Sequence, residues 1–74
     1  MAVSVNLDAV LDPEYQSSAL RDLVNAPVSA LSGISEAEAE GLRQGFGIET
    51  IGDLADNPFV RAAVAIREMA KIAQ

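Results

Sequence analysis

Proline, glycine and helix-capping residues divide this 74-residue chain into short segments. Asp12-Pro13-Glu14 is typical of a helix start, because the aspartate can accept from free N–H groups and proline suits the first helical position. Apolar residues follow at helical spacing as far as Val24. Asn25-Ala26-Pro27 then stops the helix, because the residue before a proline is pushed out of the α region. We therefore expect one helix from about Pro13 to Val24.

Two more helices are expected in the middle of the chain. The first covers Val28–Leu31, with Gly33 at or near its C-terminal cap. The second runs from about Glu36 to Gln44 and begins at Ser35-Glu36-Ala37-Glu38, which has the spacing of a capping box. Gly45 is expected to end this helix in a left-handed conformation.

The remaining segments complete the prediction of an all-α fold. Thr50-Ile51-Gly52-Asp53 repeats the capping-box pattern and starts a very short helix, and Asn57-Pro58 opens the longest helix, which ends near Ala73. No convincing strand is present, and the connections are two to five residues long. We expect a compact bundle of about five short helices, with the aromatic residues Tyr15, Phe46 and Phe59 in its core because they are too scattered to form a base-stacking platform.

Residues 1–12 allow two interpretations. Alternate residues from Val3 to Leu7 are apolar, as in a strand, whereas Leu7, Val10 and Leu11 would share one side of a helical turn. A loose arm and a short helix therefore stay open as equal alternatives, and the helical domain is assigned from residue 13 to the end. The segment lacks a basic stretch followed by a long apolar run, so we do not expect a signal peptide.

The densest set of motifs lies in Ala30–Ala55, where a Gly-apolar turn, a capped helix, a second glycine turn and another capped helix follow one another. This segment resembles the helix-hairpin-helix family, in the five-helix arrangement similar to the N-terminal domains of archaeal and eukaryotic recombinases. The residues that carry the resemblance are Leu31, Gly33, Ile34, Ala39, Leu42, Gly47, Ile48, Thr50, Ile51, Leu54 and Ala55. The two hairpin turns would then consist of Gly33, Ile34 and Ser35, and of Gly45, Phe46 and Gly47.

The resemblance implies non-specific DNA binding, which members of the family often achieve with glycine-flanked N–H groups at a helix N-terminus. This chain departs from the pattern at Ser35, which replaces the second glycine of the first hairpin. Glu36, Glu38 and Glu40 follow, and their charges repel a phosphate. The second hairpin leads to Ile48-Glu49 rather than directly to a helix, with only Arg43 nearby. We therefore expect structural hairpins and keep nucleic-acid binding as an alternative.

Composition restricts the chemistry that the chain can perform. Cysteine and histidine are absent, which excludes disulfides, Cys/His metal sites and the commonest nucleophile–base pairs. The glutamates lack the loop that a hard-cation site needs, and the single lysine, Lys71, lies far from the serines. We expect no enzyme activity, no metal and no cofactor. With no apolar run of the roughly 20 residues that span a membrane, a soluble cytoplasmic protein is expected.

The last helix shows an excess of apolar surface. At about 100° per residue, Val60, Val64, Arg67 and Lys71 form a stripe that mixes aliphatic and cationic side chains. A broader apolar face lies on the other side and would serve the core: Phe59, Ala62, Ala63, Ile66, Met69, Ala70 and Ala73, widened by Ala65 and Ile72. A helix that is apolar on both sides is expected to contact a second chain.

Charge is distributed unevenly along the chain. The net charge of −6 divides into −8 for residues 1–56, which have ten acids and two bases, and +2 for residues 57–74, which have three bases and one acid. The overall charge argues against phosphate-backbone binding as the main function. The separation of an acidic body from a basic last helix favours self-association or binding to an acidic protein partner.

These observations predict a protein-binding module, an adaptor or assembly component, that binds a protein partner or a second copy through Val60, Val64, Arg67 and Lys71. Two alternatives remain open. One is non-specific DNA or RNA backbone binding through the two hairpins. The other is an accessory subunit of an enzyme, docked by the Val3–Leu11 arm.

Overall fold

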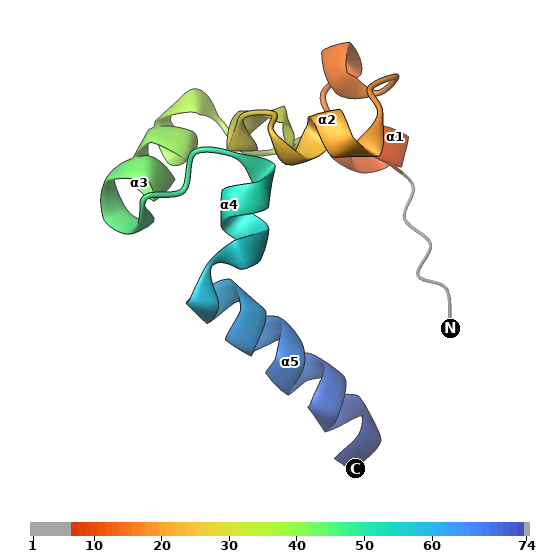
Figure 1. Ribbon diagram of the computed structural model, residues 1–74, viewed down its shortest axis with the longest axis vertical. Coiled ribbons are helices and arrows are strands. Elements are labelled where there is room, and N and C mark those ends of the chain that lie inside the picture. The colour runs from red at the N-terminus through yellow and green to blue at the C-terminus, as the bar shows by residue number, and fades with distance from the viewer. Residues whose placement is uncertain (1–6, 74) are drawn as a thin grey trace.

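The computed structural model describes residues 7–73, and most of that range is helical (Figure 1). The elements in chain order, with η for a 3₁₀-helix, are α1 (Leu7–Val10), η1 (Pro13–Tyr15), α2 (Leu20–Val24), η2 (Val28–Ala30), α3 (Glu36–Phe46), α4 (Ile51–Asp56) and α5 (Pro58–Ala73). Extended pairing between the described residues is limited to two isolated antiparallel bridges. The all-α fold class is therefore confirmed.

The segment around η2 is the centre of the fold. On one side of it, the Asp12 N–H donates to the Ala30 carbonyl at 2.9 Å, and on the other side the Val28 N–H donates to the Glu49 carbonyl at 3.0 Å. Val28 and Ala30 are the most completely buried of the described side chains. Backbone hydrogen bonds therefore fix η2 between the N-terminal turn and the start of α4, and the core forms around it.

The core is small and contains only aliphatic side chains. Its buried members among the described residues are Leu11, Leu23, Ala26, Val28, Ala30 and Ile48. None of them belongs to α5. A core of this size is expected for so short a chain, which can bury only about 60% of its unfolded surface even when it is compact.

The helix predicted over Pro13–Val24 is broken in the structure. The segment forms η1 and then, after a bend, α2, and Ala19 before α2 has an extended backbone with ψ 149°. Asp12 makes no side-chain capping bond. Leu11 and Leu23 are both buried, so the chain between them turns back toward the core instead of running straight past it.

The N-terminal segment forms a short helix where it is described. Leu7–Val10 makes the single turn of α1, and the buried Leu11 pairs with Leu31 in an antiparallel bridge. Val3 and Val5, which suggested a strand or an arm, lie outside the described residues.

The end of α3 differs from the prediction by two residues. Gly45 was expected to end the helix, but the helix continues to Phe46 and Gly47 takes the left-handed conformation, with φ +69°. The Gly47 N–H donates to the Arg43 carbonyl at 3.0 Å, which is the bond of an αL motif. The Ile48 N–H donates to the Leu42 carbonyl at 3.2 Å. Ile48 is buried, so the chain must leave the helix at Gly47 to bring the Ile48 side chain into the core.

Candidate functional site

The start of α5 is fixed by Asn57. Its Oδ1 accepts hydrogen bonds from the N–H groups of Phe59, at 2.9 Å, and Val60, at 3.1 Å. Pro58 occupies the first helical position, where its missing N–H costs nothing. The predicted start of the longest helix is therefore confirmed.

Helix α5 projects away from the other helices and carries the chain to its C-terminus (Figure 1). Every residue from Arg61 to Ala73 is exposed. Ile66 and Ile72 are 63% and 83% exposed. The apolar face that was expected to serve the core is thus in solvent, because α5 leaves α4 in a direction that carries it past the core. We name this face the α5 seam: Phe59, Ala62, Ala63, Ile66, Met69, Ala70 and Ala73.

The four residues predicted to bind a partner lie in different surroundings. Val60 is half-buried near α4, and Val64 is 57% exposed. Arg67 and Lys71 line a shallow groove along α5, together with Ala63, Ile66 and Ala70. The two cations therefore share a groove with part of the α5 seam, whereas Val64 does not line that groove.

The two phenylalanines are not core residues, contrary to the prediction. Phe46 and Phe59 are 59% and 72% exposed. Their rings meet edge to face, with centroids 6.3 Å apart and an interplanar angle of 66°. This contact joins the end of α3 to the start of α5 at the surface. Tyr15, the third aromatic residue, is half-buried.

The N-terminus of α3, which follows the turn at residues 33–35, is already occupied by a carboxylate. The Ser35 N–H donates to the Glu38 Oε1 at 2.9 Å, and the Glu38 N–H donates to the Ser35 Oγ at 3.1 Å, so the predicted capping box is confirmed. The hydrogen bonds from the Ser35 backbone and side chain lower the pKa of Glu38. Gly33 before this box has φ +94°, and Ile34 is half-buried.

The helix after the second glycine turn has the same arrangement. Asp53 Oδ2 accepts from the N–H groups of Glu49 and Thr50, each at 3.1 Å, and the Asp53 N–H donates to Thr50 Oγ1 at 3.0 Å. The two backbone N–H groups lower the pKa of Asp53. A phosphate would have to displace this carboxylate to reach the same donors.

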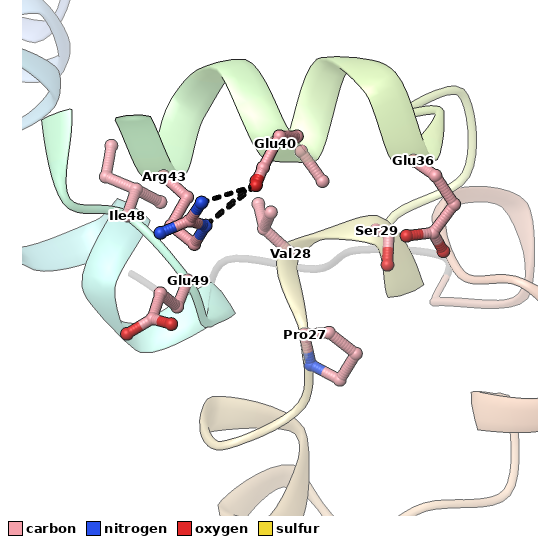
Figure 2. A pocket seen from close by; sticks show the side chains of 9 residues that line it. Pro27, Val28, Ser29, Glu36, Glu40, Arg43, Ile48 and Glu49 are labelled. Carbon is pink, nitrogen blue, oxygen red and sulfur yellow. Dashed lines mark hydrogen bonds and ion pairs between the residues drawn. The ribbon is translucent and has the colours of Figure 1, made fainter. Parts of the chain in front are cut away.

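A cleft of about 340 Å³ lies between α3 and η2 (Figure 2). Its sides carry Glu36, Glu40, Arg43 and Glu49. Arg43 holds Glu40 through both carboxylate oxygens, with Nη2 to Oε1 at 2.6 Å. This hydrogen bond lowers the pKa of Glu40 and raises that of Arg43.

The cleft was not predicted from the sequence. Glu36 and Glu40 are four residues apart, so they share one face of α3, and both line the cleft. Pro27, Val28 and Ile48 also line the cleft. Their position there depends on how η2 packs against α3, and no local sequence motif predicts that packing. In the part of the chain that is described, no group of three acidic side chains is arranged to hold a metal ion.

The chain was compared with protein families, curated proteins and solved structures. No protein-family model, no curated protein and no solved structure matches the chain. Among the described helices, none combines the length and the hydropathy that crossing a membrane requires.

Proposed function

We propose that the protein is a non-enzymatic protein-binding module, an adaptor or assembly component, and that α5 is its binding element. The observation that carries the proposal is the exposure of the α5 seam, centred on Ile66. An isolated helix of this length is marginally stable in water and gains most of its stability from packing of its apolar face. A partner that covers the seam supplies that packing.

The proposed interface differs from the predicted stripe. Arg67 and Lys71 remain in it, as the charged border of the groove that contains Ala63, Ile66 and Ala70. A charged border around an apolar centre is the usual composition of a protein interface. Val64 lies about 160° around the helix from Ile66 and falls outside the proposed surface.

The capped helix starts support a structural role for the glycine turns. Glu38 and Asp53 take the backbone donors that a phosphate would use, and the net charge is −6. We therefore propose that Ala30–Ala55 is a helix-hairpin-helix-like unit that positions α5, and we place nucleic-acid binding second. Micromolar binding of duplex DNA at physiological salt, with a steep salt dependence, would contradict this order.

The accessory-subunit alternative has less support. The side chain of Leu11 belongs to the core of this chain, so it is not available to a larger protein. Deleting residues 1–6 leaves this core contact in place and is expected to leave partner binding unchanged. A loss of binding in that variant would favour docking by the arm.

Site-specific photo-crosslinking tests the proposed function. A photoreactive amino acid is placed in the full chain at position 66, in the α5 seam, and at position 17, an exposed site before α2. Cells that make the protein are irradiated, and the adducts are identified by mass spectrometry. The proposal expects a specific protein adduct from position 66 and none from position 17; equal adduct patterns from both positions would show that α5 is not the binding element.

A further inference from the structure

We infer that the partner of α5 is a second copy of this chain, paired with the first through antiparallel α5 helices that cross at Ile66. The inference rests on the proposed function and names the occupant of the α5 seam. Three observations support it: the pattern of large and small side chains along the seam, the distribution of charge, and the exposure of α5 from Arg61 to Ala73.

The seam is self-complementary when two copies run antiparallel. Ile66 lies at its centre, both along the helix and around it. With Ile66 on the twofold axis, Phe59 faces Ala73 of the second copy, and Met69 faces Ala63 of the second copy. Each of these large side chains therefore meets a small one, as an isologous interface requires.

The groove on α5 has the form that receives such a side chain. Ala63, Ile66, Arg67 and Ala70 line it, and they have the spacing i, i+3, i+4 and i+7. Four residues at this spacing form the hole into which a side chain of a facing helix packs. Alanine at two of the corners lets the helix axes approach to about 8 Å.

Charge favours the antiparallel orientation over the parallel one. Residues 1–56 carry −8 and residues 57–74 carry +2. A parallel pair would place the two acidic bodies side by side at one end. An antiparallel pair separates them by about the 24 Å length of a 16-residue helix, and it brings the basic C-terminal half of each α5 close to the acidic body of the other copy. The antiparallel orientation also places the positive end of each helix dipole beside the negative end of the other, which is an attractive arrangement.

The size of α5 sets the size of such an interface. A standard interface takes about 800 Å² from each partner, and the face of one 16-residue helix supplies only a small interface. The pair of short helices falls at the small end of that class. We therefore expect a dissociation constant of about 10–100 µM.

Sedimentation equilibrium of the full chain, from about 5 µM to about 500 µM so that the expected dissociation constant is bracketed, tests the association. Ile66→Glu places a charge at the centre of the seam and is expected to weaken the dimer more than 30-fold. Val64→Glu is the matched control, because Val64 is 57% exposed and Ile66 is 63% exposed, so neither change disturbs the core. Val64→Glu is expected to dimerise like the wild type. Ile66→Ala, which keeps helix propensity, is expected to weaken the dimer in the same direction by about tenfold.

Engineered cysteines test the orientation, because the chain has none of its own. In the antiparallel pair, Met69→Cys alone does not form an intermolecular disulfide, whereas a mixture of Met69→Cys and Ala63→Cys chains does. A disulfide between two Met69→Cys chains would indicate a parallel pair and overturn the arrangement.

The remaining outcomes separate this inference from the proposed function. A wild-type chain that stays monomeric throughout the concentration range would overturn the inference, and so would a dimer that survives Ile66→Glu. If the monomeric chain still gives a specific photo-crosslink to a different protein from position 66, the proposed function stands and only the identity of the occupant is wrong.

Discussion

Gly45 and Gly47 are two residues apart, and their substitution by alanine is expected to change stability in opposite directions. Gly47 has φ +69° and nothing lies within 4 Å of an added Cβ, so Gly47→Ala creates no clash and its cost is the left-handed backbone alone. That cost is roughly 1–2 kcal/mol, partly offset by the lower entropy of the unfolded chain. We expect a net loss of about 1 kcal/mol.

Gly45 lies within the last turn of α3, and an added Cβ there also meets nothing within 4 Å. Gly45→Ala should therefore stabilise the protein by about 0.5 kcal/mol, because alanine favours the helix and restricts the unfolded chain. Gly47→Asn provides a second comparison, since asparagine tolerates the left-handed region, and should lose less than Gly47→Ala.

Thermal and urea unfolding measure both effects. In a domain of this size 1 kcal/mol corresponds to about 4–8 °C in Tm, so the two alanine variants should lie on opposite sides of the wild type. If Gly45→Ala destabilised the protein as much as Gly47→Ala, the helix would end at Gly45, and our description of the α3 terminus would be wrong.

Three further changes test the caps and the packing between helices. Asn57→Ala removes the acceptor for the first N–H groups of α5 and should cost about 1 kcal/mol in urea unfolding; an unchanged midpoint would show that the cap is not formed. The pKa of Asp53 is lowered, so the stability that its charge contributes is fully present above the ordinary pKa of 3.8 and is lost as the pH falls through the lower pKa of the folded state. The difference in unfolding free energy between the wild type and Asp53→Asn should therefore shrink as the pH falls below 3.8. A difference that stays constant with pH would contradict this role of Asp53. Gly52→Ala places a Cβ 2.8 Å from Val24 Cγ1 and 3.0 Å from the Val24 carbonyl oxygen, so it should lower stability by about 1–3 kcal/mol; a gain in Tm would show that α2 and α4 are not packed this closely.

The local signals in the sequence were sufficient for the starts of α3, α4 and α5. Both capping boxes, at Ser35 and Thr50, form as predicted, and Asn57-Pro58 opens the longest helix. These predictions succeed because a cap involves residues only three positions apart, and no distant part of the chain can change its geometry much.

Predictions that depended on distant contacts were less successful. The pattern Pro13–Val24 suits one helix, but the burial of Leu11 and Leu23 bends the chain between them. Gly45 is as good a terminator as Gly47, and the position of the buried Ile48 selects the latter. The periodicity of a helix shows that it has an apolar face but does not show what covers that face.

The same limit applies to the candidate site. The amphipathic pattern identified α5 and the cations Arg67 and Lys71, yet it assigned the seam around Ile66 to the core. The direction in which α5 leaves α4 decides this point, and a single residue, Asn57, connects the two helices. No pattern of apolar residues records that direction.

Hydrogen exchange of α5 as a function of protein concentration tests the central claim most directly. If α5 is exposed in the single chain and covered in the dimer, the amides from Arg61 to Ala73 should exchange rapidly at about 1 µM and become protected at several hundred micromolar, on either side of the expected dissociation constant. The amides around Val28 should be equally protected at both concentrations. Exchange in α5 that does not depend on concentration would contradict the account.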